Sequence, residues 1–356
     1  MAYREEDPWR LPPSVKGEDF RLNGSGGRIP SPALKERLRR IVNRTPEVMV
    51  KITGRTRGGT GHLKAHLDYI TRNGRVHAET QNGERITDHA RLRDLHDVWL
   101  TRNKVEARGR SPLNAAQSVN IILSMPGGTP PDRVEAAART WARETLGSNH
   151  DWLMARHDDT DHAHVHISVR AVGNDGLRLA PGPQELQLWR ERFARELRRF
   201  GIEAEATPRQ ARGAVRKNAP SPIHHTESRS TDPRVRSLER REANADARRT
   251  KLAKPAKWSS AIQARQESIR RSYLGHAAEL AKGDSDDRQL ARDIQRFVAD
   301  MPVPLTRRQI IAVELRRVLE QKGTQIQALP LENTQTNDVG LKHVLEPYPS
   351  APTLKL

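Results

Sequence analysis

Hydrophobic residues alternate with polar ones in several short segments of this chain. In the segment 47–54, Val48, Val50 and Ile52 fall on one side of an extended chain, which predicts a strand with one buried face. Residues 118–124 predict a second strand. The sequences DWLMARH and HAHVHISVRAV predict two more strands that follow each other closely.

Between these strands the hydrophobic residues recur every three or four positions, as in amphipathic helices. Leu63, Leu67 and Ile70 form one such stripe after the first strand. Three further helices are predicted over residues 88–102, from residue 130 onward, and over 186–200. The order strand, helix, helix, strand, helix, strand, strand, helix predicts an α+β fold with helices packed on a sheet.

The character of the chain changes on both sides of this pattern. The N-terminal residues are rich in Pro, Gly and charge, and the segment after residue 205 has more Lys and Arg than Asp and Glu and few large apolar side chains. The predicted divisions are a flexible arm (1–45), a folded domain (46–205), a basic linker (206–255), a helical region (256–323) and a disordered tail (324–356).

Composition narrows the functions that the folded domain can have. The net charge of +18 over 356 residues favours a polyanionic partner, with nucleic acid first. No apolar run approaches the roughly 18 residues that cross a membrane, and no signal peptide opens the chain, so we expect no membrane insertion and a cytoplasmic location. The absence of Cys excludes disulfides, thiolate metal sites and cysteine nucleophiles.

Four histidines and three aspartates lie close together in ARHDDTDHAHVHISVRA, residues 155–171. On a strand, His162, His164 and His166 point to one face, opposite the apolar residues between them. Two imidazoles two residues apart can hold one ion, and His157 can supply a third ligand across the hairpin. The aspartates between them lie within reach of the imidazole N–H groups. The alternative is a polar hairpin whose histidines face solvent.

The order of His157, Asp159, Asp161, His164 and His166 resembles the third motif of the conjugative relaxases of the VirD2-like type, which belong to the HUH endonucleases. In that family the positions of His157, His164 and His166 hold a divalent metal ion, and the acidic residue at the position of Asp161 supports a ligand. The resemblance implies a relaxase-like fold with a central antiparallel-rich β-sheet, and Mg²⁺ or Mn²⁺ as the cofactor.

A relaxase of this type requires a tyrosine N-terminal to the histidines, and Tyr69 is the one tyrosine within 46–205. It stands in HLKAHLDYITRNGRV, which resembles the first motif of the family, a tyrosine followed by a small polar residue, Arg or Lys, and Gly. Helical spacing places His62, His66 and Asn73 on one polar face with Tyr69. The alternative is a tyrosine at the rim of the core with no chemical role.

Several residues near these motifs are candidates for DNA contacts. The segment GRTRGGTG offers Arg55 and Arg57 to phosphates, and Arg72 belongs to the tyrosine motif. Ser124 lies in ILSMPGG, which occupies the place of the second motif of the family. A solvated basic loop and an ordinary strand-to-turn signal remain as alternatives.

The resemblance implies a site- and strand-specific DNA nickase that starts conjugative transfer or plasmid mobilisation. In this reaction a tyrosine, here Tyr69, attacks a phosphodiester, stays joined to the 5′ phosphate and releases a 3′-hydroxyl. Asp159 is the candidate acceptor of the phenolic proton. The partners implied are single-stranded DNA at an origin of transfer, accessory relaxosome proteins and a type IV coupling ATPase, with export of the protein into a recipient cell on the attached DNA.

Two other enzymes and one binding protein remain as alternatives. HAHVHIS also fits the signature of histidine-triad nucleotide hydrolases, which make no use of a tyrosine. A rolling-circle replication initiator shares the histidine pair, but its tyrosine lies C-terminal to that pair, where Tyr273 has no supporting motif. A noncatalytic basic DNA-binding scaffold would need neither the histidines nor the tyrosine.

Overall fold

The computed structural model describes residues 30–57, 60–109, 112, 114–213, 223, 226–227, 229, 233–248 and 257–328. These residues fall into two compact units, 30–208 and 209–328. Residues 329–356 of the predicted tail (324–356) and most of the predicted arm lie outside the described residues, whereas residues 324–328 are helical. None of the described helices is long and apolar enough to span a membrane.

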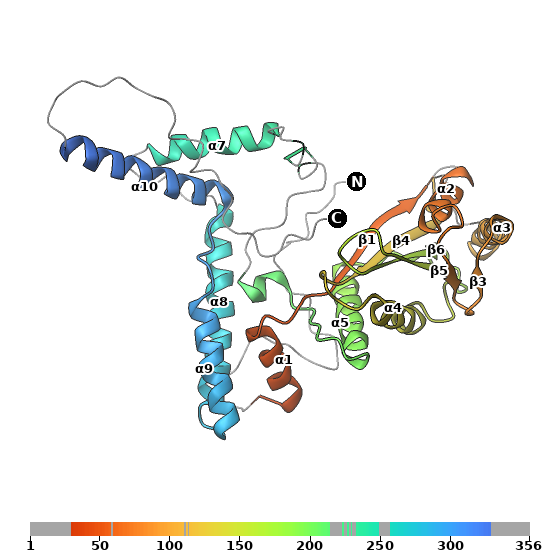
Figure 1. Cartoon of the computed structure of the whole chain (residues 1–356), viewed down its shortest axis with the longest axis horizontal. Helices are drawn as coiled ribbons and strands as arrows, with labels where there is room; N and C mark the ends of the chain where they lie inside the picture. The colour runs from red at the N-terminus through yellow and green to blue at the C-terminus, as the bar shows by residue number, and fades with distance from the viewer. Residues whose placement is uncertain are drawn as a thin grey trace. The chain divides into compact units, whose positions relative to one another are not determined.

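A six-stranded sheet forms the centre of the first unit (Figure 1). Its strands lie in the order β1-β4-β6-β5-β2-β3, and every neighbouring pair is antiparallel. The strands are β1 (Met49–Thr56), β2 (Ala78–Thr80), β3 (Arg85–Ile86), β4 (Ser118–Ser124), β5 (Trp152–His157) and β6 (His164–Arg170). The predicted α+β class with an antiparallel sheet is confirmed.

Helices cover both faces of this sheet. The helices of this unit are α1 (Pro32–Val42), α2 (Thr60–Ile70), α3 (His89–Glu106), α4 (Pro131–Leu146) and α5 (Pro183–Arg199), of which α2 to α5 pack on the sheet. Helices α4 and α5 bury Trp141, Phe193 and their neighbours against β1, β4, β5 and β6. Helices α2 and α3 bury Leu67 and Trp99 against the short strands and β5. Because α2 and α3 pack over the β5 side, polar residues of β6 and β4 occupy the rest of that face.

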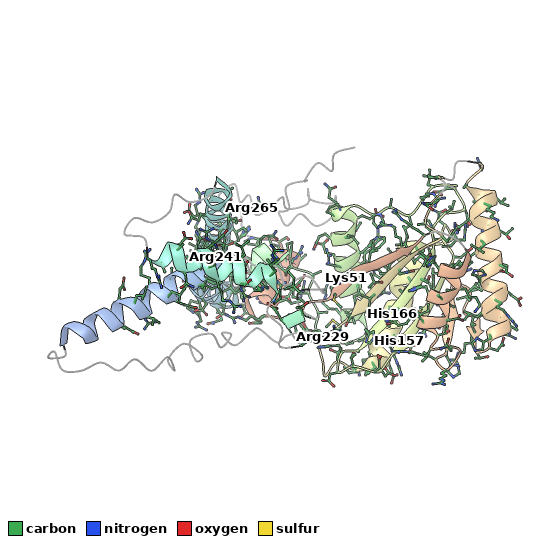
Figure 2. All side chains as sticks on the ribbon, turned by 90° about the horizontal axis from the view of Figure 1, so that it is seen from above. Lys51, His157, His166, Arg229, Arg241 and Arg265 are labelled. Carbon is green, nitrogen blue, oxygen red and sulfur yellow. The ribbon has the colours of Figure 1, made fainter. Side chains whose placement is uncertain are left out.

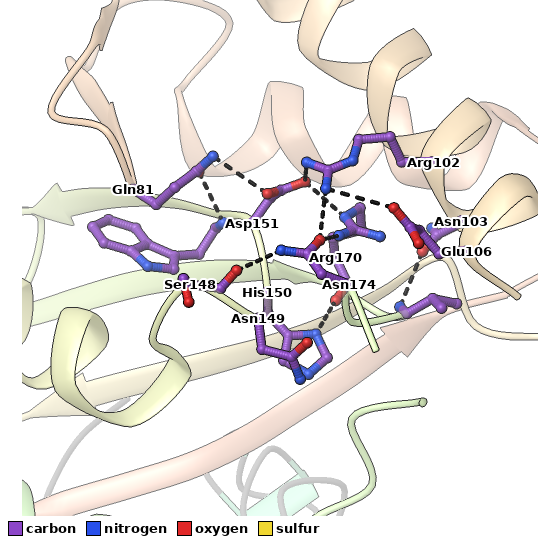
Figure 3. Close-up of polar contacts among 12 residues, drawn as sticks. Gln81, Arg102, Asn103, Glu106, Ser148, Asn149, His150, Asp151, Arg170 and Asn174 are labelled. Atoms are coloured by element: carbon purple, nitrogen blue, oxygen red, sulfur yellow. Dashed lines mark hydrogen bonds and ion pairs between the residues drawn. The ribbon is translucent and has the colours of Figure 1, made fainter. Parts of the chain in front are cut away.

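A buried polar network closes the end of the sheet away from the histidine motif (Figure 3). Arg170 is fully buried, and its Nε donates to Asp151 at 2.7 Å. Nη1 of Arg102, from α3, donates to the same carboxylate oxygen at 2.7 Å. Asn174 accepts from both guanidinium groups. One carboxylate therefore compensates a buried charge and fastens α3 to the sheet.

In the first unit the structure differs from the sequence-based expectations at three places. Helix α1 lies inside the segment 1–45 that we predicted to be a flexible arm, with Leu38 and Ile41 buried and Arg40 bonded to Glu205 at 2.8 Å. The two short strands β2 and β3 were not predicted, because segments this short show no periodicity. Strand β1 continues to Thr56, into the segment GRTRGGTG, for which a solvated basic loop was the alternative.

The second unit is helical. It contains a 3₁₀ turn, η1 (Arg209–Arg212), and the helices α7 (Arg234–Ala247), α8 (Lys257–Leu280), α9 (Ser285–Ala299) and α10 (Arg307–Ala328). Helices α8 and α9 pack together, as do α7 and α10. Tyr273 is buried here, and its hydroxyl donates to the carbonyl of Ala211 at 2.9 Å. Helix α7 occupies part of the segment that we predicted to be a linker.

Removing the carboxylate of Asp151 should destabilise the first unit. In Asp151→Ala the fully buried guanidinium of Arg170 loses its counter-ion, and a broken buried ion pair of this kind costs about 3 to 5 kcal/mol. A lower urea midpoint measured by circular dichroism would show this. Asp94→Ala removes an exposed carboxylate of α3 and should change the stability by no more than about 0.5 kcal/mol. Equal stability of the two variants would contradict the structural role of the network.

Candidate active site

Three histidines meet on one face of the sheet because of the register of the β5–β6 hairpin. His157 pairs with His164, and Ala155 pairs with His166, so both strands present imidazoles to the same side. One ring nitrogen of each lies within 4.8 Å of the other two. The ring centroids are 4.4 Å apart for His157 and His166, 5.6 Å for His157 and His164, and 5.3 Å for His164 and His166. The predicted three-histidine cluster therefore forms, and it is the one such group found among the described residues.

Backbone carbonyls decide which nitrogen of two of these rings carries a proton. Nε2 of His157 lies 2.7 Å from the carbonyl oxygen of Ile70, and Nδ1 of His164 lies 2.9 Å from that of His162. Because a carbonyl oxygen can only accept, each of these nitrogens must donate. The neutral ring then keeps its lone pair on Nδ1 of His157 and Nε2 of His164. This arrangement of outer hydrogen bonds fits a metal centre.

Burial favours the neutral form of two of the three histidines, His157 and His166. His157, His164 and His166 are 2%, 8% and 9% exposed. The pKa of His166 is lowered to about 3, first by burial and then by the neighbouring His157 and His164. Burial also lowers the pKa of His157, against the hydrogen bond to Ile70, which raises it. Neutral imidazoles are the state that binds a divalent cation.

Tyr69 lies over this cluster. It is the next-to-last residue of α2, one position before the Ile70 carbonyl that accepts from His157. Its ring centroid is 6.1 Å from that of His157 and 5.8 Å from that of His166, with edge-on geometry in both cases. The side chain is 53% exposed, so the hydroxyl is accessible from outside. The predicted pairing of this tyrosine with the histidines is present in the fold.

The chain after Tyr69 makes a left-handed turn that brings Arg72 back to the site. Arg72, Asn73 and Gly74 have φ angles of 50°, 56° and 78°, which glycine and asparagine adopt most readily. The guanidinium carbon of Arg72 lies 5.7 Å from the centre of the Tyr69 ring, and Nη2 lies 3.4 Å from Nδ1 of His157. The TRNG sequence thus places a fixed positive charge between the phenol and the imidazoles.

The two aspartates that we singled out differ in their surroundings. Asp159 forms an ion pair with Arg72, and its Oδ1 lies 3.7 Å from Nε2 of His164. Its pKa is lowered: burial acts to raise it, but the charge of Arg72 and the hydrogen bond to it prevail. Asp161 is exposed, and no hydrogen bond or ion pair joins its carboxylate to the histidines. Asp159 is therefore the carboxylate that adjoins the cluster.

Not all of the residues that we predicted to contact DNA are exposed on the sheet face that carries the histidines. Ser124 pairs with His164 in the sheet, but it is 1% exposed and its hydroxyl donates to the carbonyl of Met125 at 3.3 Å. Arg55 pairs with Val119, whose side chain belongs to the core under α4 and α5. The register therefore places Arg55 on the sheet face opposite the histidines. Arg57 is exposed just after β1.

His66 belongs to the site, although we did not include it among the site residues from the sequence. Its ring stacks near that of Tyr69, with centroids 6.3 Å apart and planes inclined by 27°. Burial lowers its pKa to about 4, so it is neutral at physiological pH. Its place three residues before Tyr69 on one helix face was the signal for this contact.

Comparisons with known proteins agree with this geometry. The family model of the MobA/VirD2-like relaxase nuclease domain matches residues 69–202. The T-DNA border endonuclease VirD2 of Rhizobium radiobacter is 30% identical over 191 residues, which cover 48% of this chain and 44% of the relative. The same-named proteins of Rhizobium rhizogenes and Agrobacterium fabrum are 27% and 29% identical over 208 and 179 residues, or 53% and 45% of this chain and 46% and 40% of those proteins.

The chain thus spans less than half the length of these curated relatives. No solved structure gives a significant match. The matched segment begins at the tyrosine that lies over the cluster and contains all three histidines and both aspartates. Residues 69–202 of this chain are therefore similar to the nuclease domain of the MobA/VirD2-like relaxases.

Proposed function

We propose that this protein is a metal-dependent relaxase, which cuts one DNA strand at a specific site and stays joined to the 5′ end through Tyr69. The observation that carries the proposal is the position of the phenol beside the histidines. Its ring centre lies 6.1 Å from that of His157 and 5.8 Å from that of His166. A phosphate held at the histidines would lie within reach of the phenolic oxygen.

The ligands of the ion in this proposal are Nδ1 of His157, Nε2 of His164 and one nitrogen of His166. A divalent cation there, Mg²⁺ or Mn²⁺, supplies positive charge to the non-bridging oxygens of the phosphate and so lowers the cost of attack by an anion. Arg72 supplies a second positive charge on the side of the phenol, and Asp159 holds its guanidinium in place. The lowered pKa of Asp159 makes this orienting role more suitable for it than that of proton acceptor.

The reaction of the chain's own groups is a transesterification. The phenolic oxygen of Tyr69 forms a bond to phosphorus, the bond from phosphorus to the 3′ oxygen breaks, and the phenolic proton leaves while the 3′ oxygen takes up a proton. The phosphotyrosyl ester replaces the phosphodiester, so the number of ester bonds is unchanged and the reverse reaction can reseal the strand without ATP. His66, neutral and beside Tyr69, limits the access of water to one side of the phenol.

The proposed substrate is single-stranded DNA at an origin of transfer. The proposed setting is conjugative transfer or plasmid mobilisation, with accessory relaxosome proteins, a type IV coupling ATPase and export of the attached protein. The family match and the names of the relatives support this setting, and the net charge of +18 is compatible with it.

Loss of the phenolic hydroxyl should abolish the covalent product. The substrate is a set of overlapping single-stranded oligonucleotides that together cover the DNA around the gene of this protein, incubated with Mg²⁺ or Mn²⁺. The intact protein should give a shifted protein–DNA band on a denaturing gel, and Tyr69→Phe should reduce its rate of formation by about a thousandfold or more, because no other group takes the place of an absent nucleophile.

Tyr273→Phe is the matched control. It removes the hydroxyl of the other described tyrosine, which is buried in the helical unit, and should leave the adduct unchanged. An adduct that persists in Tyr69→Phe and disappears in Tyr273→Phe would exclude the proposed nucleophile and favour a tyrosine C-terminal to the histidines.

Metal affinity should depend on the three histidines of the cluster. His166→Ala removes one of three nitrogen ligands, and we expect Mn²⁺ to bind at least about tenfold more weakly, as seen in titration calorimetry or in the electron paramagnetic resonance signal of free Mn²⁺. This measurement of Mn²⁺ affinity requires neither DNA nor DNA-cutting activity.

His162→Ala tests whether the effect is specific to the cluster. His162 lies in the same hairpin but does not belong to the cluster, and its carbonyl, which orients His164, is unaffected by the substitution. Its Mn²⁺ affinity should stay within about twofold of the parent. A loss of the same size in His162→Ala and His166→Ala would contradict the assigned ligand set.

A further inference from the structure

Strand β1 lies at the edge of the sheet, two strands away from the histidines. It pairs with β4, and β4 pairs with β6. In this register Lys51 stands opposite Ile122, and Ile122 stands opposite His166. Residues opposite each other in neighbouring strands share a face, so Lys51 and His166 lie on the same face in one line across the sheet. Neighbouring strands are about 4.8 Å apart, which places the Cα atoms of Lys51 and His166 roughly 10 Å apart.

A bulge in β1 decides which basic residue of this strand faces the histidines. Strict alternation would put Lys51 and Arg55 on one face, because they are four residues apart. The register shifts between Ile52 and Gly54, so one extra residue is inserted and the alternation reverses. The hydrogen bond between the hydroxyls of Thr56 and Ser118, at 2.8 Å, belongs to the polar face and confirms that Arg55, the residue before Thr56, points the other way.

The charge of Lys51 is available to a ligand. Its side chain is exposed, and no hydrogen bond or ion pair joins its ammonium group to any residue that the structure describes. Figure 2 shows Lys51 near His166 and His157 on the sheet. On the other side of the cluster, Tyr69 and His66 belong to α2, which packs over β5. Ile122, which stands between His166 and Lys51 in β4, is 6% exposed, so a chain of nucleotides whose reacting phosphate lies between Tyr69 and the histidines would pass above the side chains that cover β4 to reach Lys51 at the edge.

We propose that Lys51 binds a backbone phosphate of the single strand next to the reacting phosphate, and that Arg55 does not contact this strand. This inference rests on the proposed function for the identity of the ligand as single-stranded DNA. A compact ammonium group on an edge strand suits a phosphate, because it carries one full charge and has no competing carboxylate in the described surroundings. The ligand contact assigned here lies outside the segment matched by the family model, which begins at Tyr69.

The test compares three variants that each remove one positive charge from an edge strand. Lys51→Ala removes it from the histidine face of β1, Arg55→Ala from the opposite face of β1, and Arg85→Ala from β3 at the other edge of the sheet. All three are made in the full chain with Tyr69→Phe, so that no covalent product forms. Binding of a fluorescein-labelled single strand of about 20 nucleotides of mixed sequence is measured by anisotropy between about 50 and 200 mM salt.

Lys51→Ala should weaken binding about three- to fivefold and reduce the slope of log K against log salt by about 0.7, the value for one phosphate contact on a single strand. Lys51→Arg should restore both quantities, because it keeps the charge. Arg55→Ala and Arg85→Ala should leave the slope unchanged. Equal losses in all three variants, or a loss in Arg55→Ala without one in Lys51→Ala, would overturn the proposal. The melting temperature of each variant shows whether the unit remains folded.

This experiment and the test of the proposed function can fail separately. If the parent protein forms the Tyr69 adduct but Lys51→Ala binds like the parent, the phosphate contact is wrong and the relaxase proposal stands. If Lys51→Ala lowers affinity and salt slope but no adduct forms with any oligonucleotide, the strand does bind at this face and the proposed chemistry is wrong.

Discussion

One hydrogen bond joins the two halves of the candidate site. Nε2 of His157, at the end of β5, donates to the carbonyl oxygen of Ile70 at the end of α2, over 2.7 Å. Because Tyr69 directly precedes Ile70, this bond holds the phenol beside the imidazoles. Because it uses the Nε2 proton, it also leaves the lone pair of His157 on Nδ1, toward the cluster. The position of the proposed nucleophile and the state of a proposed metal ligand therefore depend on the same contact.

The two ends of the sheet that carries this contact are built from different side chains. At the end away from the histidines, the fully buried Arg170 and its carboxylate partner Asp151 tie β6, β5 and α3 together. At the other end, β5 and β6 carry the imidazoles, and the left-handed turn at Arg72 brings its guanidinium next to His157. The end away from the histidines is held by buried ion pairs, and the other end presents the three imidazole rings. A site built on paired strands in this way needs little rearrangement to hold its geometry.

The large positive charge of the chain does not by itself indicate where an anion binds. Many arginines form ion pairs within the fold. Arg308 of α10 pairs with Glu242 and Asp246 of α7, and Arg170 pairs with Asp151 in the buried network. What distinguishes Lys51 is the combination of exposure, the lack of a partner among the described residues and a place in line with His166. Charge patterning identifies the class of partner, but the pairing of each cation within the fold identifies the surface that remains for it.

The sequence by itself determined the four longer strands, the face shared by His164 and His166, and the stripe that carries Tyr69, because side-chain direction within one strand or helix follows from local backbone geometry. The motif order also indicated the family. Tertiary structure alone decided that Asp159 rather than Asp161 adjoins the cluster, and that helix α1 packs on the domain. It likewise decided that Lys51 rather than Arg55 shares the histidine face. These outcomes depend on a β-bulge and on contacts between residues that are far apart in the sequence. The periodicity of hydrophobic residues within one segment reveals neither of them.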